Sequence, residues 1–121
     1  MKRNIKLIRL ILQALEGDAD AAKESTEKFS LAERSYHVAL MVDAGLIVGV
    51  THEDADGHPT EGYHVSRMTW SGHDFLDAMR DDTIWQKALE KVVKPGASWT
   101  FDLLKDWAKQ EIKQRLGLPE I

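Results

Sequence analysis

Histidines and acidic residues gather between residues 52 and 64, where their nitrogen and oxygen atoms could bind a metal ion. The run Asp54-x-Asp56-Gly57 resembles the start of a calcium-binding loop, in which carboxylates occupy alternate positions. Such a loop needs a glutamate at its twelfth position, where this chain has Val65, and the glycine comes too early. The other potential ligands are His52, Glu53, His58 and His64. We therefore expect a polar loop here and no metal site.

His37 and His73 form a second candidate pair. His37 lies in an expected helix and His73 in a later one, so the two side chains could approach each other in the core, near Tyr36 and Trp70. A close pair would bind a metal or act as a pH-sensitive switch. A zinc site needs a third ligand, and no residue at a fitting spacing supplies one. We expect both histidines to be structural, hydrogen-bonded in the core or at its margin.

Asp81 and Asp82 are adjacent carboxylates of the kind that acid–base catalysis uses. Adjacent residues of a helix point apart, and aspartate favours the N-cap position, so a helix break explains both. The chain has no glycine-rich phosphate loop, no GxSxG and no HExxH. It also has no cysteine, which excludes disulfides, zinc–thiolate sites and thiol nucleophiles. We expect no enzyme, no catalytic residue and no cofactor.

Charge is distributed unevenly along the chain, whose net charge is −4. Residues 1–16 contain four bases and one acid, whereas residues 17–62 contain three bases and ten acids. A DNA-binding surface needs lysine and arginine for its phosphate contacts. The bases available for such contacts are Lys2, Arg3, Lys6, Arg34 and Arg67. The acidic middle of the chain therefore disfavours nucleic-acid binding without excluding it.

Two amphipathic helices are predicted in the first half of the chain. Apolar residues recur at helical spacing over residues 3–16 and 30–44. Ser30 and Glu33 have the spacing of a capping box, which satisfies backbone groups at the start of the second helix. Gly45 follows as a residue suited to the left-handed conformation that ends a helix.

A β-hairpin is predicted directly after the second helix. Residues 46–51 and 63–68 alternate as strands do, and a polar loop with turn-forming residues separates them. Residues 18–29 are open to two interpretations, because they have almost no apolar face. They form either a short helix or a loop with a short strand around Lys28 and Phe29.

Three further helices are predicted towards the C-terminus. The first begins after Thr69, the second begins at Thr83, and Ser98 or Thr100 caps the third. Trp70, Trp85 and Trp107 lie on apolar helix faces, so we expect them in the core. Trp99 follows a connection, and we expect it to be exposed, as at the surface of a homodimer or of a complex with another partner.

The order of helix, AGLI, strand, turn and strand between residues 30 and 66 is typical of the recognition helix and wing of a winged-helix domain. We therefore expect an α+β fold. The length favours a single domain over residues 1–121. Within it we expect a winged-helix-like core over residues 1–80 and a two-helix extension over residues 81–121.

Three stretches carry a resemblance to a known family. They read MKRNIKLIRLIL, YHVALMVDAGLI and MTWSGHDFLDAMRDDTIW. Together they resemble the bacterial and phage-related family named domain of unknown function 2513, over most of the chain and most specifically in the third stretch. The resemblance implies a winged-helix-like fold, and it implies no catalytic residue and no cofactor.

The charge pattern favours a non-enzymatic interaction module on a winged-helix scaffold. Such a module would bind a protein partner, or itself as a homodimer, in bacterial or prophage regulation. The alternative is a DNA-binding transcriptional regulator in which the helix over residues 30–44 enters the major groove with Arg34. The apolar runs are far shorter than the roughly 18 residues that span a bilayer, and the N-terminus lacks a signal cleavage site. We expect no membrane partner and a cytoplasmic protein.

Overall fold

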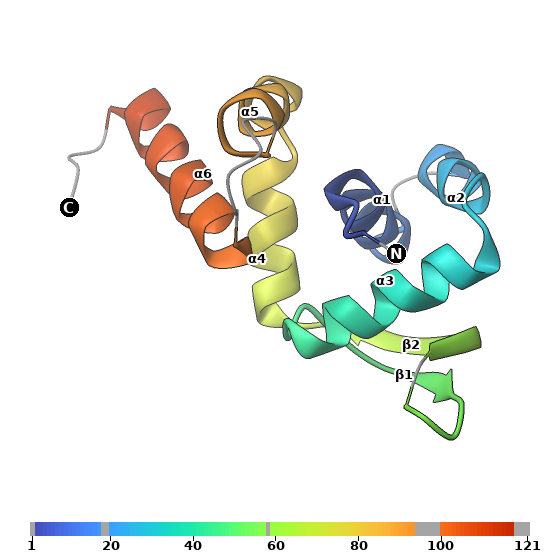
Figure 1. Ribbon diagram of the computed structural model, residues 1–121. Helices are drawn as coiled ribbons and strands as arrows, with labels where there is room; N and C mark the ends of the chain where they lie inside the picture. The colour runs from blue at the N-terminus through green and yellow to red at the C-terminus, as the bar shows by residue number, and fades with distance from the viewer. Residues whose placement is uncertain (1, 18–19, 58, 94–99, 118–121) are drawn as a thin grey trace. The chain divides into compact units, whose positions relative to one another are not determined.

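The structure is a computed structural model that describes residues 2–17, 20–57, 59–93 and 100–117. Its elements make a mixed α+β chain, as predicted, and Figure 1 shows them in chain order. They are α1 (Ile5–Leu15), α2 (Asp20–Glu27), α3 (Leu31–Asp43), β1 (Ile47–Glu53), β2 (Pro59–Met68), α4 (Trp70–Met79), α5 (Asp82–Ala88), the π-helix η1 (Leu89–Val93) and α6 (Phe101–Leu116). The chain divides into two compact units, Met1–His73 and Asp74–Ile121, with the boundary inside α4.

Helix α1 begins at an asparagine cap and buries one face. Asn4 Oδ1 accepts hydrogen bonds from the backbone N–H groups of Lys6 and Leu7, at 3.0 and 3.4 Å, which satisfies two donors that have no partner inside the helix. Leu7 and Leu12 are completely buried. The predicted amphipathic helix is therefore confirmed.

Helix α2 settles the two interpretations of residues 18–29 in favour of a helix. Lys28 and Phe29 follow it in a turn, where their N–H groups donate to the carbonyls of Ser25 and Thr26. Thr26 is buried, and it lines a cavity together with residues of α1. Helix α2 therefore packs through a small polar side chain, whereas most helices pack through an apolar stripe. The short strand around residues 28 and 29 was the wrong alternative, and the sheet of the described residues has only β1 and β2.

Helix α3 has the caps that its sequence predicts. Ser30 Oγ accepts from the Glu33 N–H at 3.0 Å, and the Glu33 carboxylate accepts from the Ser30 N–H at 3.5 Å. At the other end Gly45 has a φ of +76°, and its N–H donates to the carbonyl of Val42. The Leu46 N–H reaches back to the Met41 carbonyl, and the buried Leu46 side chain starts the path into β1.

The hairpin is longer than predicted. Strand β1 continues to Glu53 and antiparallel β2 starts at Pro59, with the two residues paired across the ladder. A bulge falls between Val48 and Gly49. A side chain at Gly49 would place its Cβ 2.6 Å from the carbonyl oxygen of His64, so glycine lets the two strands remain close at this bulge.

Helix α4 starts in close contact with the end of α3. Thr69 Oγ1 donates to the Gly45 carbonyl and accepts from the Gly72 N–H, and the Thr69 N–H donates to the Leu46 carbonyl. Gly72 has no room for a Cβ, because the Leu46 carbonyl and the Met68 side chain occupy that space. The predicted start of this helix after Thr69 is confirmed.

The second unit contains the rest of α4, α5, η1 and α6. Phe75 and Phe101 pack with ring centroids 4.5 Å apart, and Leu104 and Ala108 bury one face of α6. Trp85 is 6% exposed, as predicted. Thr100 caps α6 by accepting from the Leu103 N–H, whereas the alternative cap Ser98 lies outside the described residues. The predicted helix that begins at Thr83 corresponds to α5 followed by η1.

Candidate functional site

Helix α3 lies between α1 and the hairpin in the first unit (Figure 1), and His37 joins it to the start of α1. The ring is 1% exposed, and Nε2 accepts from the Asn4 N–H at 2.8 Å. Nδ1 lies 2.8 Å from the Glu33 carbonyl oxygen, to which it donates in the tautomer that this arrangement requires. Both ring nitrogens therefore have protein partners, and His37 is structural, as predicted.

His73 lies at the surface and does not share these partners. Its Nδ1 is 3.9 Å from Glu16 Oε2, with about half of the side chain exposed. Trp70, expected beside the two histidines in the core, is 83% exposed, so that prediction is wrong. The reason is helix phase: α4 buries Gly72, Phe75, Leu76 and Met79, and Trp70 lies on the opposite face.

A second buried polar side chain fixes the hairpin to α3. Ser35 is completely buried, and its Oγ accepts from the Gly62 N–H of β2 at 3.1 Å. Because a buried N–H without a partner is costly, this bond holds α3 in one position along β2. His37 and Ser35 therefore give the inner face of α3 a structural role, because each bonds to another element of the first unit.

Arg34 belongs to the inner side of α3 as well. It lines a cavity of about 190 Å³ between α1, α2 and β2, together with Ile11, Thr26 and Tyr63. Its Nε is buried and has no hydrogen-bond partner in the structure. The one basic residue of the supposed recognition helix therefore lies among α1, α2 and β2.

The outward face of α3 is apolar and acidic. Five half-exposed or exposed residues at helical spacing form this outward stripe. They are Ala32, Tyr36, Ala39, Leu40 and Asp43. The stripe contains one carboxylate and no base, so it offers no cation to a phosphate backbone.

The other bases predicted for nucleic-acid contact are exposed but come from separate elements. Lys2 and Arg3 precede α1, and Lys6 lies in its first turn. Arg67 lies on β2, opposite Val48 of β1. A nucleic-acid footprint would therefore have to use α1 or β2 rather than α3.

The hairpin loop is an ordinary polar turn. Asp54 Oδ1 accepts from the Asp56 N–H at 2.9 Å, and Gly57, with a φ of +82°, donates its N–H to the Asp54 carbonyl. Among the residues that the structure describes, no three histidines or carboxylates gather closely enough to hold a metal ion. His58, one of the potential ligands in the sequence, lies outside those residues.

In the second unit, Asp81 is a helix cap. Its Oδ1 accepts from the N–H groups of Thr83 and Ile84 at 2.8 and 3.0 Å, and Arg115 Nη1 lies 3.0 Å from its Oδ2. The Ile84 hydrogen bond, with the Arg115 charge and the Thr83 bond, lowers the pKa of this carboxyl against a smaller effect of desolvation. Asp82 is the first residue of α5. Trp99, the predicted interaction residue, lies outside the described part of the chain.

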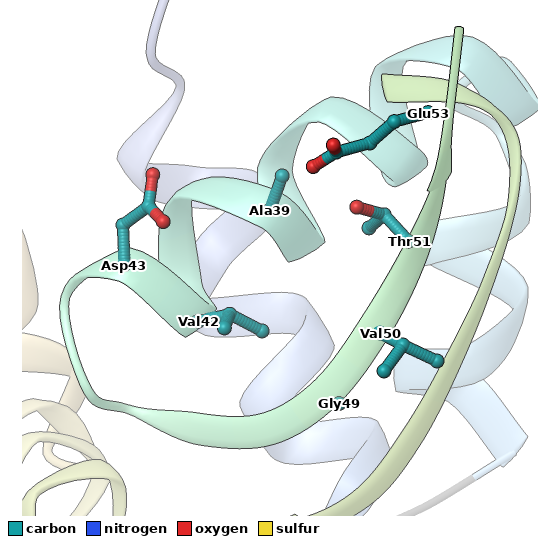
Figure 2. Close-up of a pocket in the computed structure, with 7 residues that line it drawn as sticks. All are labelled: Ala39, Val42, Asp43, Gly49, Val50, Thr51 and Glu53. Atoms are coloured by element: carbon teal, nitrogen blue, oxygen red, sulfur yellow. The ribbon is translucent and has the colours of Figure 1, made fainter. Parts of the chain in front are cut away.

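An open groove of about 360 Å³ separates the second half of α3 from β1 (Figure 2). Its lining comes from α3 and β1: Ala39, Val42, Asp43, Gly49, Val50, Thr51 and Glu53. Val50 is 63% exposed, and the carboxylates of Asp43 and Glu53 lie on either side of the groove in Figure 2. We call this feature the α3–β1 groove.

Sequence reasoning missed both the groove and the exposed Trp70. Alternation in β1 could have indicated that Val50, which lines the groove, would be exposed, since it lies on the face opposite the buried Ile47. No signal in the sequence places α3 at the correct distance from the strand. Trp70 was assigned to the core because it was placed on the apolar face of its helix, whereas the buried face of α4 runs through Phe75 and Leu76 and leaves Trp70 on the opposite side.

Comparison with known proteins identifies the family. The family model described as hypothetical protein (DUF2513) matches residues 2–98. An uncharacterized protein of Haemophilus influenzae is 32% identical over 122 residues, which cover 97% of this chain and 100% of that protein. The chain belongs to the DUF2513 family. No solved structure matches it significantly, and no helix in the described ranges is long and apolar enough to cross a membrane.

Proposed function

We propose that this chain is a non-enzymatic, cytoplasmic protein-interaction module, built on a winged-helix-like scaffold and acting in bacterial or prophage regulation. The scaffold proposal is supported by the order of α1, α2, α3 and the hairpin. It differs from the common pattern in one respect, since a two-stranded hairpin is the whole sheet of the described residues. One scaffold serves many functions, so the surface has to decide between them.

The main observation in support of this proposal is the outward stripe of α3. A recognition helix in the major groove reads base edges with arginine, lysine, asparagine or glutamine, and the stripe has none of these. Exposed Asp43, Glu53 and Asp54 would also approach phosphates, each at a cost of up to about 1 kcal/mol where solvent screens the charges. An apolar surface with acidic surroundings suits a protein partner better than a polyanion.

Trp70 provides a second exposed apolar feature of the same unit. Tryptophan is enriched among the few residues that supply most of the energy of protein interfaces. The indole is 83% exposed, so little of its surface is buried within the chain. Burial against a partner would remove that apolar surface from water.

A DNA-binding regulator is the second candidate function. The exposed bases Lys2, Arg3 and Lys6 at the start of α1 favour it, with Arg67 on β2. In that case α1 rather than α3 would provide the main phosphate contacts. Binding would then be strongly salt-dependent, because each phosphate contact releases counterions.

The deciding experiment is fluorescence anisotropy of a mixed-sequence DNA duplex titrated with the chain at about 50 and 200 mM salt. We expect no saturable binding at the lower salt. Salt-dependent binding that Lys6→Ala or Arg67→Ala weakens would refute the protein-interaction proposal and establish the DNA alternative.

A second experiment tests for protein binding directly, by capturing proteins from a bacterial lysate on the immobilised chain. We expect Trp70→Ala to reduce capture, while Leu103→Ala, which removes an exposed apolar side chain of α6, leaves it unchanged. Equal capture by the wild type and both variants would count against Trp70 as an anchor.

A further inference from the structure

The α3–β1 groove follows the free edge of a strand. Gly49, Val50 and Thr51 are consecutive in β1, and side chains of consecutive strand residues point to opposite faces. Their common position along one groove therefore indicates that the groove runs beside the backbone of β1. On its other edge β1 pairs with β2, so hydrogen-bonding groups on the groove side lack a neighbouring strand within the described sheet.

Strand β1 has little of the protection that free edges usually have. Proteins protect exposed edges with lysine, proline or very short strands. Strand β1 has seven residues, of which Ile47–Thr51 include neither a charged residue nor a proline, and its one acidic residue, Glu53, stands at its end. By contrast, β2 begins with Pro59 and contains Arg67. The less protected edge is thus the one that borders the groove.

The charges of the groove select the kind of partner. Asp43 and Glu53 are exposed and lie at its two sides, and its lining includes no basic residue. Val42 and Val50 provide apolar surface in the same groove. An extended segment with alternating lysine or arginine and small apolar residues would place cations beside the carboxylates and apolar side chains against the valines.

We infer that the α3–β1 groove is a docking site for an extended, basic segment of a partner protein, which adds to the hairpin as a third strand beside β1. Main-chain hydrogen bonds to β1 provide the affinity, and the two carboxylates select a basic sequence. This inference rests on the proposed function, because it names the chemistry of the partner that the module binds.

A second copy of the chain fits this groove less well than a basic partner does. Pairing two β1 edges around a two-fold axis would bring Asp43 and Glu53 of one copy towards the same carboxylates of the other. Like charges at such an interface oppose association. We therefore expect the chain to leave its β1 edge free of self-pairing.

The test uses the full-length chain and a fluorescent peptide of sequence Lys-Thr-Lys-Val-Lys-Thr-Lys. We expect saturable binding that weakens with salt, and changes in the NMR amide signals of Gly49, Val50 and Thr51. Two control peptides isolate the mechanism: one has glutamate in place of lysine, and the other has N-methyl groups on alternate backbone amides. We expect neither control peptide to bind, because the first reverses the charge and the second removes strand hydrogen bonds.

Variants of the chain locate the site. Asp43→Lys and Glu53→Lys should each weaken peptide binding by about tenfold, as expected for reversing a charge that faces an opposite one. Glu24→Lys makes the same change at an exposed position of α2, and we expect unchanged affinity. Circular dichroism spectra like that of the wild type would show that each variant is folded.

The outcomes separate this inference from the proposed function. Absence of peptide binding, binding that survives N-methylation, or NMR changes confined to other residues would overturn the groove as a docking site. If lysate proteins are still captured, the protein-interaction function stands without it. A wild-type dimer that Val50→Lys converts to a monomer in analytical ultracentrifugation would replace the basic partner with a second copy.

Discussion

The backbone N–H of Asn4 donates a hydrogen bond of 2.8 Å to Nε2 of His37, 33 positions later in the chain. The Asn4 side chain also caps α1, and the His37 ring reaches the Glu33 carbonyl within α3. One residue pair thus fixes the start of α1 against the middle of α3. Because the His37 ring is 1% exposed, loss of these contacts should be felt in the stability of the first unit.

His37→Ala should destabilise the chain by about 2–4 kcal/mol, because it leaves the Asn4 N–H without its partner, removes the ring contact with the Glu33 carbonyl and opens a cavity. Urea unfolding followed by circular dichroism measures the change. His73→Ala is the matched control, since that ring is exposed and its contact with Glu16 is a weak surface pair. Similar losses for both variants would contradict the structural role of His37.

Local signals in the sequence predicted most of the helix ends. Ser30 and Glu33 form the predicted capping box, Gly45 has the predicted left-handed conformation, and Thr69 precedes α4. Each of these features depends on neighbours within a few residues, so the local sequence contains the information. Residues 18–29 were left with two interpretations because their local sequence contains no such signal. Helix α2 lacks an apolar stripe and packs through residues such as Thr26.

Features that depend on distant residues could not be predicted in this way. The partner of His37 is Asn4, and the partner of Ser35 is Gly62, each set by how the elements pack. The direction of Arg34 follows from how α1, α2 and β2 pack around it, so the sequence alone placed it with the outward residues. The groove depends on the same packing, since it exists only where α3 and β1 diverge.

Gly72→Ala should destabilise the chain by about 1–3 kcal/mol, as overpacking usually does. The new Cβ would overlap the Leu46 carbonyl and the Met68 side chain, and the carbonyl can move only with its backbone. Thermal unfolding measures the loss. Ser71→Ala is the neighbouring control, because that residue is half-exposed and alanine favours helices. A Gly72→Ala variant as stable as the wild type would show that α4 does not start in such close contact with Leu46.

Trp70 should contribute strongly to the quenching of tryptophan fluorescence by acrylamide. Its indole is 83% exposed, whereas that of Trp85 is 6% exposed. Trp70→Phe should therefore reduce the quenching constant of the chain, while Trp85→Phe should raise it by removing a protected emitter. A quenching constant that Trp70→Phe leaves unchanged would place the indole in a buried position and remove the basis for its role as an interface anchor.

Asp81 should make the stability of the second unit depend on acid pH. Folding lowers the pKa of its carboxyl through the Ile84 hydrogen bond, with help from Arg115, so the charged form is favoured in the folded state. Its contribution is then complete above the unfolded pKa of about 3.9 and is lost as the pH falls through the lower folded value. Asp81→Asn keeps an acceptor for the cap but removes the charge, so its difference in urea midpoint from the wild type should shrink as the pH falls below about 4. Asp106→Asn, at an exposed position of α6, should show no such convergence. A constant difference between Asp81→Asn and the wild type across this range would refute the charge-based stabilisation of the α5 cap.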